Sequence, residues 1–247
     1  MEKKFGLIGK TVGHSFSKNF FDEKFFRDGL RDHHYDLYAL KDISDLKTLL
    51  KDNPEIRGLN VTIPYKEQVI ELLNEVDEMA KVIGAVNVIK IENKKLKGFN
   101  TDYNAFLETL QRWLPADIKP KALVLGTGGS SKAVCVALKK LSVPFEMVSR
   151  QEKLVEHTYE SIKKNPSVIE NVNLIINTTP LGMSPDTESF PPIPYDSLGD
   201  HHYVYDLIYN PARTVFLQKA EMRNAKIKNG LEMLHLQAEK SWEIWNK

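Results

Sequence analysis

The feature that most constrains the fold is a glycine-rich stretch at Lys121–Ser131, KALVLGTGGSS. Its apolar run, Ala122–Leu125, predicts a buried parallel strand that turns sharply into a helix. Gly126 permits the tight turn, and Gly128 lets the backbone approach a pyrophosphate that faces the helix N-terminus. Ser131 stands where the pattern G-x-G-x-x-G places its third glycine. An ordinary strand-to-helix turn is therefore the alternative interpretation.

Length and charge narrow the class of protein. A chain of 247 residues allows one large or two modest domains, and 42% hydrophobic and 27% charged residues are ordinary for a globular protein. Lys plus Arg (34) nearly balances Asp plus Glu (33), so no overall field attracts nucleic acid or an acidic membrane surface. No apolar run approaches the ~18 residues of a membrane span.

The cysteine, the first residues and the histidine pairs indicate the cellular compartment and whether a metal site is expected. The lone cysteine, Cys135, lies in the expected helix after the glycine turn, fits a reducing compartment and is expected to pack in the core. The start, MEKKFGLIG, lacks a signal-peptide pattern, so we expect a cytoplasmic protein. The pairs His33-His34 and His201-His202 lack companion ligands at useful spacing, so we expect no metal site.

Strands and helices alternate through the first hundred residues. The patterns predict strands at 5–9, 35–40, 58–63, 83–91 and 96–99, and helices at 20–26, 43–50, 66–73 and from 103. Polar side chains follow or interrupt the strands, which fits a ligand crevice at their carboxyl ends. These are Ser15, Ser17, Asn60, Thr62, Lys66, Asn87 and Asp102. The alternatives are helix capping for the serines and Asp102, internal hydrogen bonding for the amides and Thr62, and an exposed lysine.

The second half predicts a doubly wound nucleotide-binding domain. Strands are expected at 122–125, 144–148, 173–179, 203–209 and 225–228, with helices at 133–141, 214–223 and 231–245. An NAD-binding unit usually offers Asp or Glu after its second strand, but this chain has Arg150, with Lys153 close behind. Cations suit a 2′-phosphate and favour NADP, whereas an ordinary exposed arginine is the alternative. We place the domain change near residues 103–104 and expect a cleft between the domains that holds a small molecule beside a dinucleotide.

In order and spacing, a set of motifs resembles shikimate dehydrogenases over essentially the whole chain. The motifs are HSFS (14–17), NVTIPYK (60–66), GAVN (84–87), GFNTD (98–102), GTGGSS (126–131), NTTPLGM (177–183), YNP (209–211) and NGLEMLHLQA (229–238). The resemblance implies an α/β fold with two domains: a mainly parallel-sheet substrate domain at 1–103 plus 230–247, and a Rossmann-like NADP domain at 104–229. It implies reversible reduction of 3-dehydroshikimate to shikimate with NADPH, in aromatic amino-acid biosynthesis.

The same resemblance assigns residues. It implies that Lys66 and Asp102 carry the proton chemistry. The residues expected to bind substrate are Ser15, Ser17, Asn60, Thr62, Lys66, Asn87, Asp102, Tyr209 and Gln237. Those expected to bind the cofactor are Gly126, Thr127, Gly128, Gly129, Ser130, Ser149, Arg150, Lys153, Thr178, Thr179, Pro180, Gly230 and Met233.

The chemistry of these residues suits a ketone reduction. The reaction needs hydride at carbon, which the cofactor carries, and a proton at oxygen, which a lysine ammonium can supply while stabilising the alkoxide. A nearby carboxylate can orient that ammonium. Lys66 and Asp102 are 36 positions apart, and we expect them to meet across one cleft. No arginine stands in the substrate motifs, so serine hydroxyls are expected to hold the substrate's carboxylate.

The chain departs from the family pattern in two motifs and is somewhat shorter than most members, and two alternatives stay open. Ser149-Arg150-Gln151 stands where many relatives show Asn-Arg-Thr, and Glu232 where relatives often carry a smaller residue. The first alternative is a quinate/shikimate dehydrogenase that uses NAD or NADP. The second is a dinucleotide-binding regulator without turnover. The expected partner is a small-molecule substrate rather than nucleic acid or a membrane, and the expected state is monomer or homodimer.

Overall fold

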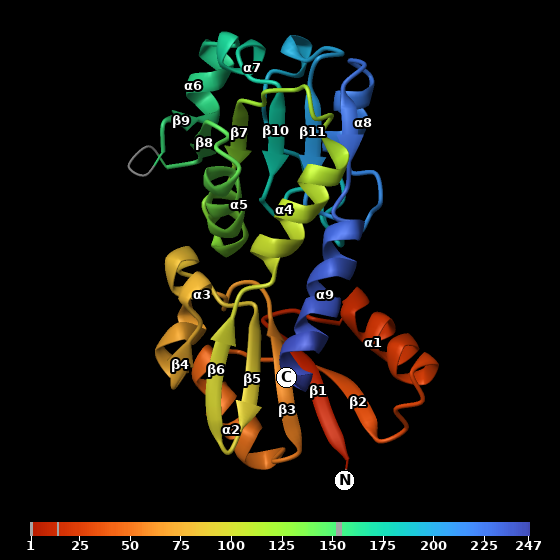
Figure 1. Cartoon of the computed structure of the whole chain (residues 1–247). Helices are drawn as coiled ribbons and strands as arrows, with labels where there is room; N and C mark the ends of the chain where they lie inside the picture. Colours follow the sequence, from red (N-terminus) through yellow and green to blue (C-terminus); the bar gives the residue numbers. More distant parts are fainter. Residues whose placement is uncertain (1, 14, 152–154) are drawn as a thin grey trace. The chain divides into compact units, whose positions relative to one another are not determined.

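The computed structural model describes residues 2–13, 15–151 and 155–247. The chain divides into two compact units, Met1–Asp102 with His235–Lys247 and Tyr103–Leu234. Each unit has its own six-stranded sheet (Figure 1). We expected the C-terminal return at residue 230, but the first unit resumes only at His235, because the final helix α9 (Leu231–Asn246) begins in the second unit.

The sheet of the first unit is mixed. Its strands are β1 (Lys3–Gly9), β2 (His33–Ala39), β3 (Ile56–Val61), β4 (Glu75–Val76), β5 (Val88–Glu92) and β6 (Lys95–Phe99). They lie in the order β2-β1-β3-β5-β6-β4. β1 pairs in parallel with β2 and β3, whereas β5 pairs antiparallel with β3 and β6. The parallel strands place the chain after β1 and after β3 at one edge of the sheet, as a ligand site requires.

Helices flank this sheet. They are α1 (Phe16–Arg27), α2 (Leu46–Asp52), α3 (Glu78–Ile83) and the later part of α9, with 3-10 turns η1 (Ile43–Asp45) and η2 (Gln68–Leu72). An aromatic cluster packs α1 and α9 on the strands: the rings of Phe21 and Tyr35 stack at 4.5 Å, and those of Phe5 and Trp245 at 4.9 Å. Phe26 does not join this cluster and is 90% exposed.

Two expected elements of the first unit were wrong. The apolar run 83–91 is not one strand, because residues 78–83 form α3, whose first turn is capped by Asp77. Gly84, with φ of +70°, ends α3 in the left-handed conformation, and the strand β5 starts only at Val88. The helix expected at 66–73 is instead the short 3-10 helix η2, and Lys66 lies in the turn that precedes it.

The second unit is doubly wound and wholly parallel. Its strands are β7 (Ala122–Leu125), β8 (Phe145–Ser149), β9 (His157–Thr158), β10 (Leu174–Asn177), β11 (Tyr203–Asp206) and β12 (Lys226–Lys228). Their order, β12-β11-β10-β7-β8-β9, changes direction between β7 and β10. That switch point is where open α/β sheets bind ligands. The short strand β9 was not predicted from the sequence.

Helices cover both faces of this sheet. They are α4 (Asp102–Trp113), α5 (Gly129–Lys140), α6 (Tyr159–Lys164), α7 (Ser167–Glu170) and α8 (Val215–Glu221), with the 3-10 turn η4 (Tyr195–Ser197). Leu123, Ile175 and Val204 face a core that includes residues of α6, α7 and α8. On the other face, Tyr205 stacks on Phe106 of α4 at 5.4 Å. The helices α6 and α7 had not been expected. No helix among the described residues has both the length and the apolar character to cross a membrane.

Candidate functional site

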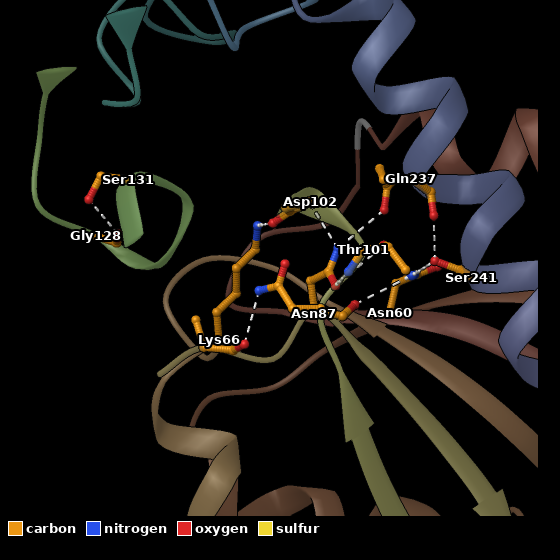
Figure 2. A network of polar contacts seen from close by, with 11 residues as sticks. Asn60, Lys66, Asn87, Thr101, Asp102, Gly128, Ser131, Gln237 and Ser241 are labelled. Atoms are coloured by element: carbon orange, nitrogen blue, oxygen red, sulfur yellow. Dashed lines mark hydrogen bonds and ion pairs between the residues drawn. The ribbon is translucent and has the colours of Figure 1, made fainter. Parts of the chain in front are cut away.

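An ion pair between Lys66 and Asp102 lies at the centre of the candidate site. Lys66 Nζ donates to Asp102 Oδ2 over 2.6 Å, and the two side chains are 14% and 8% exposed (Figure 2). The Lys66 carbonyl accepts a hydrogen bond from Val86 N at 2.7 Å, which fixes the turn after β3 against the segment that leads into β5. The expected meeting of the two side chains is present, and it lies entirely within the first unit.

Asn87 holds the carboxylate from the other side. Its Nδ2 donates to Asp102 Oδ1 at 2.8 Å and to Thr101 Oγ1 at 3.0 Å, while its Oδ1 accepts from Thr101 N at 2.7 Å. Each Asp102 oxygen therefore has one donor. Within the described part of the chain the Asp102 side chain accepts no backbone N–H of α4, so the capping interpretation does not account for it. A longer contact of 3.5 Å joins Asn87 Nδ2 to Gln237 Oε1 (Figure 2).

The amide of Asn60 is engaged by the protein itself. Its Oδ1 accepts from Tyr35 OH at 2.8 Å, and its Nδ2 donates to Ser241 Oγ at 2.9 Å and to the Asn87 carbonyl at 3.4 Å. Ser241 Oγ in turn donates to the Gln237 carbonyl at 2.7 Å. Asn60 therefore links β3 to α9. These contacts favour the alternative interpretation, in which the Asn60 amide is hydrogen-bonded within the protein. Tyr35 and Ser241 were missed by sequence reasoning, although Ser241 interrupts the apolar stripe of the final helix.

The remaining polar candidates of the first unit surround the turns after β1 and β3. Ser15 caps α1 by accepting from Ser17 N at 3.2 Å, so capping explains the Ser15 side chain. Ser17 is buried. Thr62 directly follows β3, and its backbone N–H donates to the Ile8 carbonyl at 2.9 Å. The Ser17 side chain is hydrogen-bonded to Tyr35, the residue that donates to Asn60.

The glycine turn has the shape of a phosphate cradle. Gly126 has φ of +111°, and a side chain there would approach Thr178 Oγ1 at 2.7 Å, so the turn requires glycine. A Cβ at Gly128 would meet open space, so protein packing does not demand this glycine. Gly128 is the N-cap residue of α5, and it makes no side-chain hydrogen bond to the first N–H groups of that helix. Ser131 is buried and its hydroxyl donates to the Gly128 carbonyl at 2.7 Å, so serine fits where the pattern places a third glycine (Figure 2).

The loop after β10 meets this turn at the switch point. Thr178 Oγ1 donates to the Leu125 carbonyl at 2.7 Å, at the end of β7. Asn177 Oδ1 accepts from Thr179 N at 3.0 Å and from Thr179 Oγ1 at 2.6 Å, and Pro180 follows, exposed. The candidate cofactor residues that follow β7 (126–130) and β10 (178–180) are thus brought to one edge of the sheet.

Arg150 supplies a positive charge beside β8. Ser149 ends β8 and its Oγ accepts from Gln151 N at 3.3 Å, while Arg150 is exposed. No hydrogen bond or ion pair engages the guanidinium within the described part of the chain. Lys153 lies outside the described residues. The start of α5, the open space at Gly128 and this cation fit the phosphates of NADP.

The three remaining candidates, Gly230, Met233 and Tyr209, also belong to the second unit. A Cβ at Gly230 would overlap the backbone carbonyl of Leu207, so close backbone approach alone requires this glycine. Met233 is buried and Tyr209 half-buried.

Sequence reasoning missed a buried carboxylate at the end of β11. Asp206 accepts from Asn177 Nδ2 at 3.0 Å, from Ile208 N at 3.1 Å and from Thr214 Oγ1 at 2.6 Å. Burial raises the pKa of Asp206 to about 6, although the three hydrogen bonds oppose this shift. Its only signal in the sequence is an acid inside an apolar strand. Asp206 fixes the side chain of Asn177, and Asn177 in turn accepts hydrogen bonds from Thr179 in the loop after β10.

Cys135 and His202 are both buried in the second unit. Cys135 packs in the core as expected, and burial raises the pKa of its thiol to about 11. His202 is buried, and its ring nitrogens lie 3.1 Å from the Ile169 carbonyl and 2.9 Å from Gly199 N. Among the described residues, no three His, Cys, Asp or Glu side chains gather to hold a metal ion.

Comparison with known proteins agrees with the resemblance in the motifs. Residues 7–89 match the family described as the shikimate dehydrogenase substrate binding domain. The shikimate dehydrogenase (NADP(+)) of Methanococcus maripaludis strain C7 is 39% identical over 258 residues, which cover 98% of this chain and 91% of that protein. A crystal structure of a shikimate dehydrogenase in complex with NADP+ superposes with a TM-score of 0.85 at 33% identity, covering 99% and 90% of the two chains.

A second activity occurs among the structural neighbours. A quinate dehydrogenase from Corynebacterium glutamicum in complex with NAD superposes with a TM-score of 0.84 at 26% identity, covering 99% of this chain and 93% of that one. This chain shares less sequence with the quinate dehydrogenase (26% identity) than with the M. maripaludis shikimate dehydrogenase (39% identity). The match to the M. maripaludis protein covers nearly the full length of both sequences. From this full-length identity we conclude that the chain belongs to the shikimate dehydrogenase family.

Proposed function

We propose that this chain is an NADP-dependent shikimate dehydrogenase that reversibly reduces 3-dehydroshikimate to shikimate, in aromatic amino-acid biosynthesis. As a member of the family it is an oxidoreductase acting on a CH–OH group. The observation that carries the proposal is the Lys66–Asp102 pair at 2.6 Å, held in place by Asn87. A dinucleotide-binding regulator would not need such a pair.

The residues of the pair divide the proton chemistry between them. NADPH held by the second unit would supply the hydride for the carbonyl carbon. Lys66 donates a proton to the carbonyl oxygen, and its positive charge stabilises the alkoxide as it forms. Asp102 directs the ammonium through Oδ2, because Asn87 keeps Oδ1 occupied. In the reverse direction, the neutral amine of Lys66 accepts the proton from the hydroxyl of shikimate.

Neutral polar groups would hold a triol. We assign substrate contacts to the hydroxyls of Ser15, Ser17, Thr62 and Tyr209 and to the amides of Asn87 and Gln237, with Lys66 and Asp102 at the reacting oxygen. The serines would bind the carboxylate. We assign Asn60 a positioning role, because both of its amide hydrogens have protein partners.

The second unit would hold the cofactor. The glycine turn at 126–130 and the loop at 178–180 supply phosphate and backbone contacts at the switch point. We assign the 2′-phosphate of NADP to Arg150, with Ser149 and Lys153, and the nicotinamide to Gly230 and Met233.

An initial-rate assay with shikimate and NADP+ tests the proposal directly. Lys66→Ala should lower kcat by at least about a hundredfold, the low end for loss of a positioned proton donor. Lys81→Ala is the matched control, because Lys81 is an exposed lysine of the same unit that pairs with Glu78. Near-normal turnover in Lys66→Ala would remove this lysine from the mechanism.

The quinate/shikimate alternative rests on the structural likeness to the quinate dehydrogenase. Parallel assays with shikimate and quinate, each under NADP+ and NAD+, distinguish it: higher kcat/KM for quinate would replace our assignment. Calorimetric cofactor binding without any shikimate-dependent change in nicotinamide absorbance would favour the regulator. A cytoplasmic location and a monomeric or homodimeric state remain proposals, which fractionation and analytical ultracentrifugation test.

A further inference from the structure

A basic concavity lies at one end of the first unit, away from Lys66 and Asp102. It has a volume of about 1010 Å³ and is lined by the first residues of β1 and β3, by α2, by the β5–β6 hairpin and by the end of α9. Figure 1 shows α2, the start of β1 and the β5–β6 turn together at one end of the sheet. The proposed substrate contacts follow the opposite ends of β1 and β3. An occupant of the concavity would therefore not compete with the substrate.

The charge of this surface is one-sided. Among the described residues, seven cationic side chains line the concavity against the single carboxylate side chain of Glu92. The chain as a whole is almost balanced, with 34 cationic and 33 acidic residues. A concave surface lined by one sign of charge concentrates the potential and raises the local concentration of counter-ions. The concavity therefore attracts anions, which the protein as a whole does not.

Four of the seven cations have no ion pair with any residue that the structure describes. Lys90 lies 3.7 Å from Glu92, and Arg57 donates to the carbonyls of Pro54 and Ile56 at 2.8 and 3.3 Å. The other lining lysines include Lys3, Lys47, Lys51 and Lys94, which are exposed and have no ion pair within the described ranges. Unpaired lysines that surround one depression suit a ligand with several negative charges, since each ammonium can meet a phosphate oxygen.

The floor of the concavity is apolar. Phe5, Ile56 and Trp245 form its buried base, and Leu50, Ile91 and Leu96 are partly exposed at its sides. Small-molecule sites commonly combine such an apolar lining with a few polar groups, in volumes of about 300–1,000 Å³. We propose that this concavity binds a small organic polyanion that carries two or more phosphate groups on a ring-bearing apolar body, the chemical class of the nucleoside polyphosphates.

ATP is the probe, titrated calorimetrically at low salt into the full chain saturated with NADP+, so that the cofactor site is already filled. ATP should bind, and Lys47→Ala/Lys51→Ala/Lys94→Ala should weaken that binding at least about tenfold, as loss of three favourable charges predicts. Lys139→Ala/Lys140→Ala/Lys164→Ala is the matched control: it removes the same charge from exposed sites of the second unit and should change ATP affinity less than twofold. Both variants should keep wild-type circular dichroism and shikimate turnover.

Three outcomes would overturn the proposal. ATP that binds only without NADP+ would be occupying the cofactor site. Equal weakening by the two triple variants would show attraction to net charge rather than to this concavity. Sodium tripolyphosphate that binds as tightly as ATP would remove the role of the apolar floor, and with it the class of ligand proposed.

Discussion

The buried carboxylate of Asp206 makes the stability of the protein depend on pH in a specific direction. The pKa of Asp206 is raised by burial to about 6, from an ordinary value of 3.8. The folded state therefore binds this proton more tightly than the unfolded state does. The corresponding stabilisation is complete below pH 3.8 and is lost as the pH rises through about 6.

Asp206→Asn isolates this effect because the amide mimics the protonated acid. Its Oδ1 can accept from Asn177 and from Ile208 N as the carboxylate does, and its Nδ2 can donate to the hydroxyl of Thr214, which would turn to accept. At pH 7.5 the wild type buries a charge that the variant lacks. Each pKa unit is worth about 1.4 kcal/mol, so the full difference between the ionised and neutral forms is about 3 kcal/mol.

The assay is urea unfolding of wild type and variant, followed by circular dichroism between pH 7.5 and 5.0. Between these limits the wild type should gain about 1.4 kcal/mol of unfolding free energy relative to the variant, since all other titrating groups cancel in the difference. A difference that does not change with pH would refute the reasoning, because it would mean that three hydrogen bonds compensate fully for burial of the charge. A change of opposite sign would refute it as well.

Three further substitutions test separate contacts. Gly230→Ala should cost about 1–3 kcal/mol of unfolding free energy, because its methyl group would overlap the Leu207 carbonyl; unchanged urea unfolding would contradict this. Ser241→Ala should cost about 1–3 kcal/mol and raise KM for shikimate more than it lowers kcat, because the hydroxyl binds both Asn60 and the Gln237 carbonyl; an unaltered KM would show that Gln237 does not need this support. Arg150→Gln should raise KM for NADP+ at least about tenfold in rate assays and leave KM for NAD+ within about twofold, since only NADP+ carries the 2′-phosphate; equal losses would refute the assignment.

Local signals in the sequence predicted the glycine turn correctly. Four apolar residues and Gly126, whose φ is +111°, specify a strand and a tight turn without reference to distant residues. The same reasoning failed at residues 83–91. Ile83, the last residue of α3, and the start of β5 belong to one apolar run in the sequence, and the left-handed Gly84 that follows α3 could not be recognised from composition.

The candidate site shows the same division. Its motifs predicted that Lys66, Asn87 and Asp102 belong together, and the structure joins them at 2.6 and 2.8 Å. The motifs did not predict that Asn60 is held by Tyr35 and Ser241, because that contact depends on where α9 packs, 181 positions further along the chain. The pKa of Asp206 was equally hidden, since it depends on burial and on opposing hydrogen bonds from Asn177 and Thr214.

The sequence by itself determined the family, the kinds of side chain available for proton transfer, and those elements whose periodicity and glycines act over a few residues. Only the tertiary structure decided which amides are occupied by the protein, which acid loses its solvent, and where unpaired lysines gather around one depression. The physical reason is range: turns and strands follow from neighbouring dihedral angles, whereas hydrogen-bond partners and desolvation depend on groups that come together only when the sheets and helices pack.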